Sequence, residues 1–176
     1  MPPALGELLA LLAVTIVAKG PQSFVVPFAY EPIVIVYGRL HPPLVVAAVA
    51  VLGTVIMEWV NYHFFRAVIE SRACANATRS PTALRVAHWF RRQPFLAVVL
   101  GALLPLPFGL VRIAALLARY PARRHVAATA VGRFPRYWLY AAVGAALPLP
   151  PGPVVAVGLV AAVLPLVLYR AGLKST

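Results

Sequence analysis

The chain has 176 residues, of which 62% are apolar and 11% charged, and its formal net charge at pH 7 is +12. A soluble domain of this size would not cover its surface with so few polar side chains, so the composition predicts a single integral membrane domain over residues 1–176. The arginines lie at the ends of apolar segments or inside them, which argues against a nucleic-acid partner and makes the charge a topology signal.

Six apolar segments can be read along the chain, and one polar, basic segment, residues 70–93, separates the first three from the last three. A helix needs about 20 mostly apolar residues to cross the hydrocarbon core, so we expect about four full spans plus shorter elements. The first segment is expected to be retained as a short span. In order, the apolar segments are 4–18, 21–37, 43–69, 94–118, 125–147 and 153–170.

Two of these segments are interrupted by prolines, Pro27 and Pro32 in the first case and Pro105 and Pro107 in the second. Proline removes a backbone donor and clashes with the preceding helical turn. Irregular backbone at membrane depth persists only where protein or a water-filled cavity supplies its hydrogen bonds. Both segments are therefore interpreted as re-entrant helical hairpins, the alternative being a pair of kinked full-length helices.

The two halves of the chain align with a nearly constant separation. Pro27-Phe28 aligns with Pro107-Phe108, and Gly53 aligns with Gly132. Glu31 falls within one residue of Arg112 in the same alignment. Broken segments at corresponding places are typical of transporters with a binding site near the bilayer midplane. We therefore expect an all-α membrane protein in which a hairpin followed by a transmembrane helix is repeated, with repeat 1 over residues 20–69 and repeat 2 over residues 94–147.

The distribution of lysine and arginine predicts the orientation of the chain. If the basic segment 70–93 is a cytoplasmic loop, both termini are also cytoplasmic, and only Lys19 and Arg39 lie outside. The two hairpins then enter the membrane from opposite faces, so the repeat is inverted.

Polar residues follow one face of each long span, at three- and four-residue spacing. Charged groups facing lipid would cost roughly 2.5–3.5 kcal/mol each, so we expect the two polar stripes to line one cavity. On the 43–69 span they are Thr54, Glu58, Asn61 and Tyr62. On the 125–147 span they are Thr129, Arg133, Arg136 and Tyr140.

The charged residues of these segments predict phosphate binding and proton coupling. Arginine donates two bonds to two oxygens and stays charged, so the candidate ligands of a lipid phosphate are Arg112, Arg133 and Arg136. Burial disfavours a charged carboxylate and a nearby arginine favours it, which makes Glu31 the first candidate for proton coupling and Glu58 the second. We expect Glu31 to face Arg112, and Glu58 to lie beside Arg133 and Arg136. The alternative for Glu58 is a static ion pair that fixes the two halves.

No catalytic or metal site is expected. The histidines His41, His63, His88 and His125 show no metal-ligand spacing, and no nucleophile has an obvious base beside it, so we expect neither an enzyme nor a cofactor.

The sequence resembles the DedA/VTT superfamily, also called the SNARE-associated Golgi protein family. The strongest match runs from Leu106-Pro107-Phe108 through Arg112 to Gly132-Arg133-Phe134-Pro135-Arg136 and Gly144. A weaker match in the first half includes Pro27 with Glu31, and Gly53 with Glu58 and Tyr62. Together these residues extend over about residues 20–147. The family often has an arginine where this chain has Leu106, and an acid near the position of Lys19.

The resemblance implies re-entrant hairpins from opposite sides and a lipid-related transport function. In bacterial members it implies translocation of undecaprenyl phosphate or other phospholipids, linked to the proton-motive force. We therefore expect a multi-pass protein of the bacterial cytoplasmic membrane that moves a phosphate-bearing lipid. The alternatives are a structural, envelope-maintenance protein without a substrate and an intramembrane phospholipid enzyme. The sequence leaves open whether the chain forms a homo-oligomer.

Overall fold

The computed structural model describes residues 3–21, 30–74, 78, 80–104 and 108–147, and every element within them is a helix. Pro27, Pro105, Pro107 and the expected last span at 153–170 lie outside the described residues. The α-helices are α1 (Pro3–Ala18), α2 (Glu31–Leu40), α3 (Pro43–Ile69), α5 (Pro81–Arg92), α6 (Pro94–Leu103), α7 (Phe108–Leu117) and α8 (Ala122–Ala146), with a short 3₁₀ helix at Arg72–Cys74.

Prolines begin several of these helices. Pro32, Pro43, Pro81 and Pro94 occupy the first turn of α2, α3, α5 and α6. A first-turn proline loses no hydrogen bond, because the N–H groups of that turn have no intrahelical partner. Pro32 therefore marks the start of α2 rather than a break within a helix.

The second broken segment forms two short helices that pack on each other. α6 and α7 have ten residues each, which corresponds to about 15 Å, half the thickness of the hydrocarbon core. Gly101 of α6 faces the side chain of Val111 of α7, so the chain folds back after α6. One continuous kinked helix is therefore excluded for this segment.

One helix in the described part of the chain, α3, is long and apolar enough to cross a membrane. Its bounds, Pro43–Ile69, agree with the expected span at 43–69. The expected count of about four full spans is not confirmed. α1 and the two arms of the second broken segment are apolar but short, and α8, although it has 25 residues, is not apolar enough to pass the same criterion.

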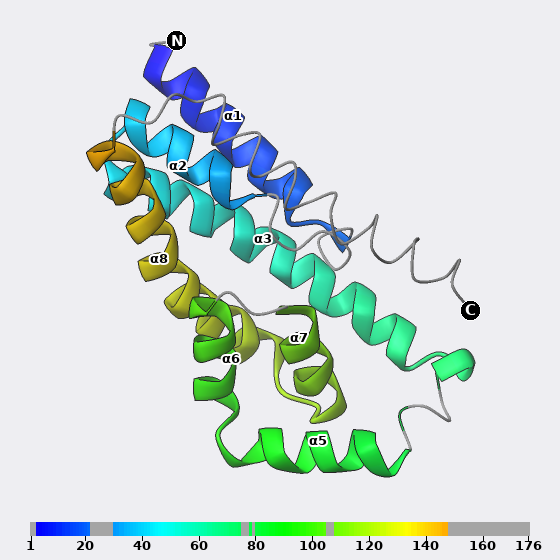
Figure 1. Cartoon of the computed structure of the whole chain (residues 1–176). Coiled ribbons are helices and arrows are strands. Elements are labelled where there is room, and N and C mark those ends of the chain that lie inside the picture. Colours follow the sequence, from blue (N-terminus) through cyan, green and yellow to red (C-terminus); the bar gives the residue numbers. More distant parts are fainter. Residues whose placement is uncertain (1–2, 22–29, 75–77, 79, 105–107, 148–176) are drawn as a thin grey trace, which may run out of the picture.

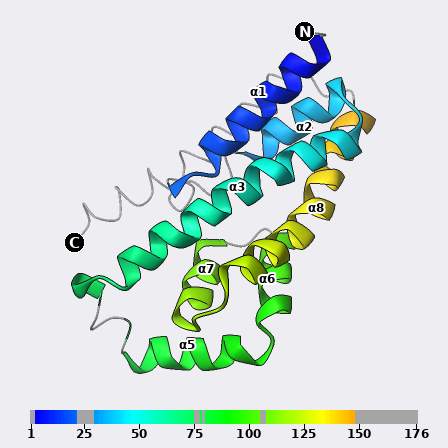
Figure 2. The same ribbon diagram turned by 180° about the vertical axis from the view of Figure 1, so that it is seen from behind.

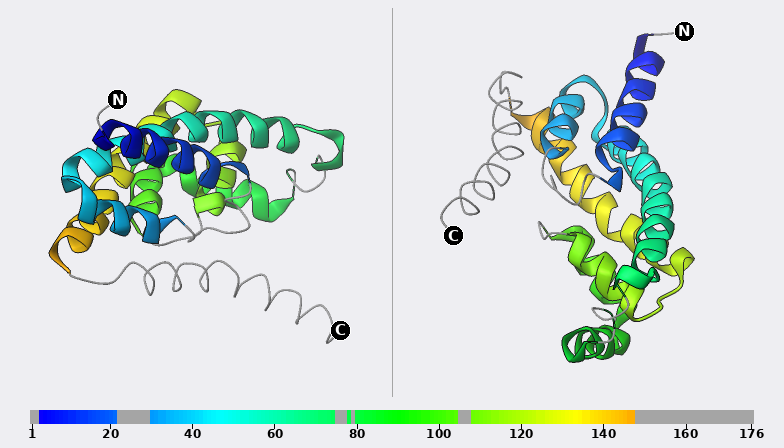
Figure 3. Two further views of the ribbon diagram at one scale, coloured as in Figure 1. Left: turned by 90° about the horizontal axis from the view of Figure 1, so that it is seen from above. Right: turned by 90° about the vertical axis from the view of Figure 1, so that its right-hand side faces the viewer.

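The two long helices α3 and α8 pack across each other, and α1, α2, α6 and α7 each pack on one or both of them (Figure 1). α1 packs on α3 and α6 packs on α8, whereas α2 packs on α8 and α7 packs on α3. Each long helix therefore contacts the first short helix of its own half and the second short helix of the other half, and α3 also contacts α2 of its own half. The side view in Figure 3 shows α1 and α2 at one end of this crossing and α5 at the other.

The basic segment 70–93 is not simply a loop, because half of it forms α5. Ser80 caps this helix by accepting a hydrogen bond from the N–H of Ala83, at 3.2 Å. Ala87 and Phe90 are buried against the rest of the protein, while Arg85, Arg91 and Arg92 are exposed. This alternation at helical spacing explains why a polar segment is helical. Figure 2 shows α5 lying across the end of the molecule.

Glycines allow α2 and α8 to approach each other closely. A side chain at Gly38 would meet the backbone of Ala141, and one at Gly144 would meet the carbonyl of Ile35. Small residues at such crossings are typical of helix packing in membranes. The contact holds the N-terminal end of α2 near the buried arginines of α8.

Gly38→Ala is expected to destabilise the protein by about 1–3 kcal/mol, because the new methyl group overlaps backbone atoms that have no room to move. The matched control is Gly6→Ala in α1, where no atom lies within 4 Å of the added methyl group. Thermal unfolding of both variants in the same detergent measures the difference. Equal melting temperatures would contradict the close α2–α8 contact.

Candidate functional site

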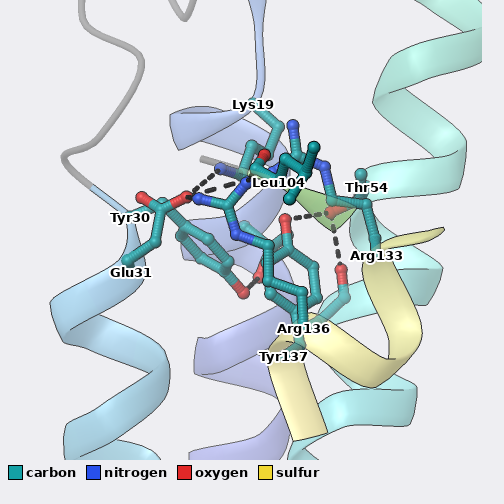
Figure 4. A network of polar contacts seen from close by, with 10 residues as sticks. Lys19, Tyr30, Glu31, Thr54, Leu104, Arg133, Arg136 and Tyr137 are labelled. Atoms are coloured by element: carbon teal, nitrogen blue, oxygen red, sulfur yellow. Dashed lines mark hydrogen bonds and ion pairs between the residues drawn. The ribbon is translucent and has the colours of Figure 1, made fainter. Parts of the chain in front are cut away.

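A buried carboxylate with three cations around it lies where α1, α2 and α8 meet (Figure 4). Glu31 is the first residue of α2, and its Oε1 accepts a hydrogen bond of 2.9 Å from Nη2 of Arg136. The Nη1 of Arg133 lies 3.9 Å and the Nζ of Lys19 lies 4.0 Å from the same oxygen. We call Lys19, Glu31, Arg133 and Arg136 the Glu31 cluster.

Two tyrosines line the Glu31 cluster on one side. The ammonium group of Lys19 lies 4.4 Å from the ring centre of Tyr30 and 5.9 Å from that of Tyr137. The two rings pack edge to face. The hydroxyl group of Tyr30 is hydrogen-bonded to Thr15, and that of Tyr137 to Thr54. Aromatic faces attract a cation, so the two rings stabilise the buried ammonium group of Lys19.

Side chains of the long helices bind the backbone where the short helices end. Nδ2 of Asn61 donates to the carbonyl of Lys19, just after α1, at 2.7 Å. Nη1 of Arg136 donates to the carbonyl of Leu104, just after α6, at 2.9 Å. The last carbonyls of a helix have no intrahelical donor, and inside a membrane they must find one in the protein. Asn61 and Arg136 thus stabilise the interruptions of both halves.

A second buried carboxylate, Glu58 on α3, forms a more compact cluster. Arg112 of α7 donates from Nε to Oε1 at 2.8 Å and from Nη2 to Oε2 at 2.6 Å. The Nε2 of His125, at the start of α8, lies 2.9 Å from Oε1. All three side chains are almost completely buried. We call Glu58, Arg112 and His125 the Glu58 cluster.

Aromatic rings surround the Glu58 cluster and separate it from the nearby surface. The guanidinium group of Arg112 lies 5.3 Å from the ring centre of Phe65 and 5.8 Å from that of Phe108. The ring of Tyr62 packs against His125 at 5.0 Å, and its hydroxyl group donates to the carbonyl of Tyr120. A polar pocket of about 390 Å³ lies beyond Tyr62, with Arg66, Arg119 and Tyr120 among its walls.

The two clusters differ in their balance of charge. In the Glu58 cluster one carboxylate meets one guanidinium group in a two-point pair. In the Glu31 cluster one carboxylate meets three cations, so the cluster carries two positive charges in excess. The Nε atoms of Arg133 and Arg136 and the Oε2 of Glu31 are buried without a hydrogen-bond partner among the described residues.

A family model, the VTT domain, matches residues 26–146. The chain belongs to the VTT domain family. Proteins of this family are membrane-associated and are often linked to lipid transport, and the resemblance to the DedA/VTT superfamily is thereby confirmed. No curated protein and no solved structure matches the chain.

The VTT domain contains all five charged residues that the sequence analysis selected, but it pairs them differently from what we expected. Glu31 meets Arg136 and Arg133, and Glu58 meets Arg112. The expected pairing was the reverse. The reason is the crossing of the helices: α2 packs on α8 and α7 packs on α3, so each short helix brings its charge to the long helix of the other half.

The supporting polar residues of the VTT domain lie at or beside these clusters. Thr54, Asn61 and Tyr62 are buried on α3, with the bonds described above. Thr129 is buried on α8, but its hydroxyl group donates to the carbonyl of His125 in its own helix. Tyr140 is half-buried, with its ring centre 5.5 Å from the guanidinium group of Arg136.

Sequence reasoning missed two members of the clusters, Lys19 and His125. His125 shares the helical stripe of Thr129 and Arg133 on α8, so its four-residue spacing was a usable signal. Lys19 directly follows α1 and precedes the residues that the family model matches. Its role follows only from the packing of α1 on α3, which no local pattern predicts.

Proposed function

We propose that this VTT-domain protein moves a phosphate-bearing lipid, undecaprenyl phosphate or a phospholipid, across the bacterial cytoplasmic membrane without changing it chemically. The observation that carries the proposal is the excess of buried positive charge in the Glu31 cluster. An uncompensated buried charge is costly, so three cations around one carboxylate are best explained by an anionic ligand that binds there part of the time.

The chemistry of the cluster suits a phosphate group. Guanidinium groups form two-point bonds with phosphate oxygens, and the free Nε atoms of Arg133 and Arg136 are donors available for them. Lys19 adds a point charge opposite. In this proposal Glu31 is an internal anion that competes with the phosphate for the same donors, and its protonation would let the ligand bind.

The Glu58 cluster has a supporting role in the proposal. Its balanced pair joins α3 of one half to α7 of the other, and His125 extends the pair toward Tyr62 and the polar pocket beyond it. Glu58 with His125 is thus the second candidate for proton coupling. Arg112, which we selected as a phosphate ligand, would bind phosphate only after releasing Glu58.

The proposed architecture is an inverted repeat with two re-entrant hairpins. It is supported by the short lengths of α6 and α7, by their side-by-side packing, and by the reciprocal arrangement in which each half places its second short helix on the other half's long helix. Both termini and α5 would face the cytoplasm, because the basic residues of segment 70–93 favour that side.

Translocation by the purified protein tests the proposal. In vesicles containing either fluorescently labelled phosphatidylglycerol or labelled undecaprenyl phosphate, the wild type is expected to expose inner-leaflet label to an external quencher. Arg133→Gln is expected to slow this about tenfold, since a bond to a charged group is worth about 1.5–3 kcal/mol. Arg123→Gln, an exposed position on the same helix, is the control and should keep the wild-type rate. Translocation of neither lipid by the wild type overturns the proposal.

A further inference from the structure

A groove of about 480 Å³ opens where α5 meets α6, away from both charged clusters. Arg92 and Gln93 lie at one end, and Leu96, Ala97 and Leu100 continue along one face of α6. Trp89 of α5 stands at the rim with 66% of its surface exposed. The groove therefore has a polar, cationic end and an apolar length.

We infer that this groove binds an anionic glycerophospholipid of the surrounding bilayer, a site separate from the proposed translocation site. One acyl chain lies along Leu96, Ala97 and Leu100, and the phosphate accepts hydrogen bonds from Arg92 and Gln93. Trp89 has the position that an indole ring takes at the membrane–water interface, with its apolar body toward the chains and its N–H toward the headgroups.

The charges of the chain support an anionic ligand. The chain has only four acidic residues, and each is already paired: Glu7 with His41, Glu70 with Arg66, and the other two inside the buried clusters. No glutamate remains for the exposed arginines of α5. Anionic lipid headgroups at a membrane surface attract such unpaired basic residues.

The orientation of α5 favours a lipid over a soluble anion. The helix turns Ala87 and Phe90 toward the protein and its arginines outward, so the guanidinium groups are accessible to a headgroup. It leads directly into α6, whose Leu96 and Leu100 are exposed apolar residues on a helix of a membrane protein. A soluble anion would leave this apolar length of the groove uncovered.

Fluorescence of Trp89 tests the inference. The chain has three tryptophans, so Trp59→Phe with Trp138→Phe leaves Trp89 as the only reporter. This protein is reconstituted in phosphatidylcholine vesicles containing an equal fraction of either brominated phosphatidylglycerol or brominated phosphatidylcholine. From the quenching of Trp89 by the two lipids, we expect the site to bind brominated phosphatidylglycerol about fivefold more tightly than brominated phosphatidylcholine. This is the effect of one arginine at an anionic surface.

Three variants distinguish binding in the groove from attraction by general surface charge. Arg92→Gln is expected to abolish the preference, whereas Arg85→Gln, which removes the same charge from the same helix but outside the groove, is expected to keep it. Ala97→Phe retains every charge and fills the groove, so it should also abolish the preference. Equal quenching by both lipids in the reporter protein, or equal losses in Arg85→Gln and Arg92→Gln, would overturn the inference. Neither result bears on translocation, which is measured separately.

Discussion

Glu58→Gln is expected to lower the free energy of unfolding by about 3–5 kcal/mol, because it leaves the guanidinium group of Arg112 buried without a counter-charge. The wild-type carboxylate accepts from Arg112 with both oxygens. A glutamine amide has one oxygen and one NH₂ group, so one of these two contacts becomes donor against donor. Thermal and denaturant unfolding in detergent micelles measures the loss.

The residue that follows the same helix provides a control, Glu70→Gln. Glu70 also pairs with an arginine, Arg66, but both side chains are more than half exposed. Exposed pairs contribute little, so the control should unfold at about the wild-type temperature. If Glu58→Gln unfolds at the same temperature as Glu70→Gln, the buried pair does not stabilise the contact between α3 and α7.

A double variant tells whether the cost comes from the unpaired charge. Glu58→Leu combined with Arg112→Met removes both charges and keeps apolar side chains of similar size. Replacing a complete buried pair in this way is often nearly neutral, whereas removing one partner is not. We therefore expect the double variant to be more stable than Glu58→Gln alone. Additive losses would instead indicate that the two residues act independently.

The fold was predictable where it depends on local patterns. Uninterrupted apolar character over residues 43–69 predicted α3 with the bounds that the structure has. Pro94 marked the beginning of α6, and the second broken segment indeed divides into two short helices, whereas Pro32, expected to break a helix, begins α2. The burial of Glu31, Glu58, Arg112, Arg133 and Arg136 also followed from sequence, since charged side chains in apolar segments avoid lipid.

The pairing of those charges was not predictable in the same way. Alignment of the halves places Glu31 and Arg112 at equivalent positions, but equivalent positions in two crossing halves lie in different clusters rather than opposite each other. Which long helix receives each short helix is decided by close backbone contacts such as Gly38 with Ala141. Such contacts join residues far apart in the sequence, and periodicity carries no information about them.

This exchange of partners changes the roles that the two glutamates are best suited to. Both carboxylate oxygens of Glu58 accept hydrogen bonds from Arg112, so exchanging this partner would break two bonds. The Glu58 cluster is therefore suited to holding the two halves together. Glu31 has one close partner, two more distant cations and a free oxygen. A carboxylate held so incompletely is the one that an arriving phosphate displaces more easily.

Glu31→Gln is therefore expected to slow translocation at least tenfold while increasing the phosphate lipid that stays bound. The substitution removes the internal anion and leaves Lys19, Arg133 and Arg136 with no competitor for the ligand. Phosphate is then held more tightly and released more slowly, and a change of about 1.4 kcal/mol in its affinity corresponds to tenfold slower release. Labelled-lipid translocation gives the rate, and phosphorus analysis of lipid extracted from the purified protein gives the amount bound.

Glu7→Gln is the control for this prediction, since Glu7 pairs with His41 at a half-exposed position on α1. It should leave both the rate and the bound lipid unchanged. A fully active Glu31→Gln variant would exclude a role for this carboxylate in the transport cycle. Lost translocation with less bound lipid at normal abundance would show instead that Glu31 orients Arg136 for the phosphate rather than competing with it. The two measurements together thus decide whether the carboxylate is the competitor of the ligand or the support of its binding site.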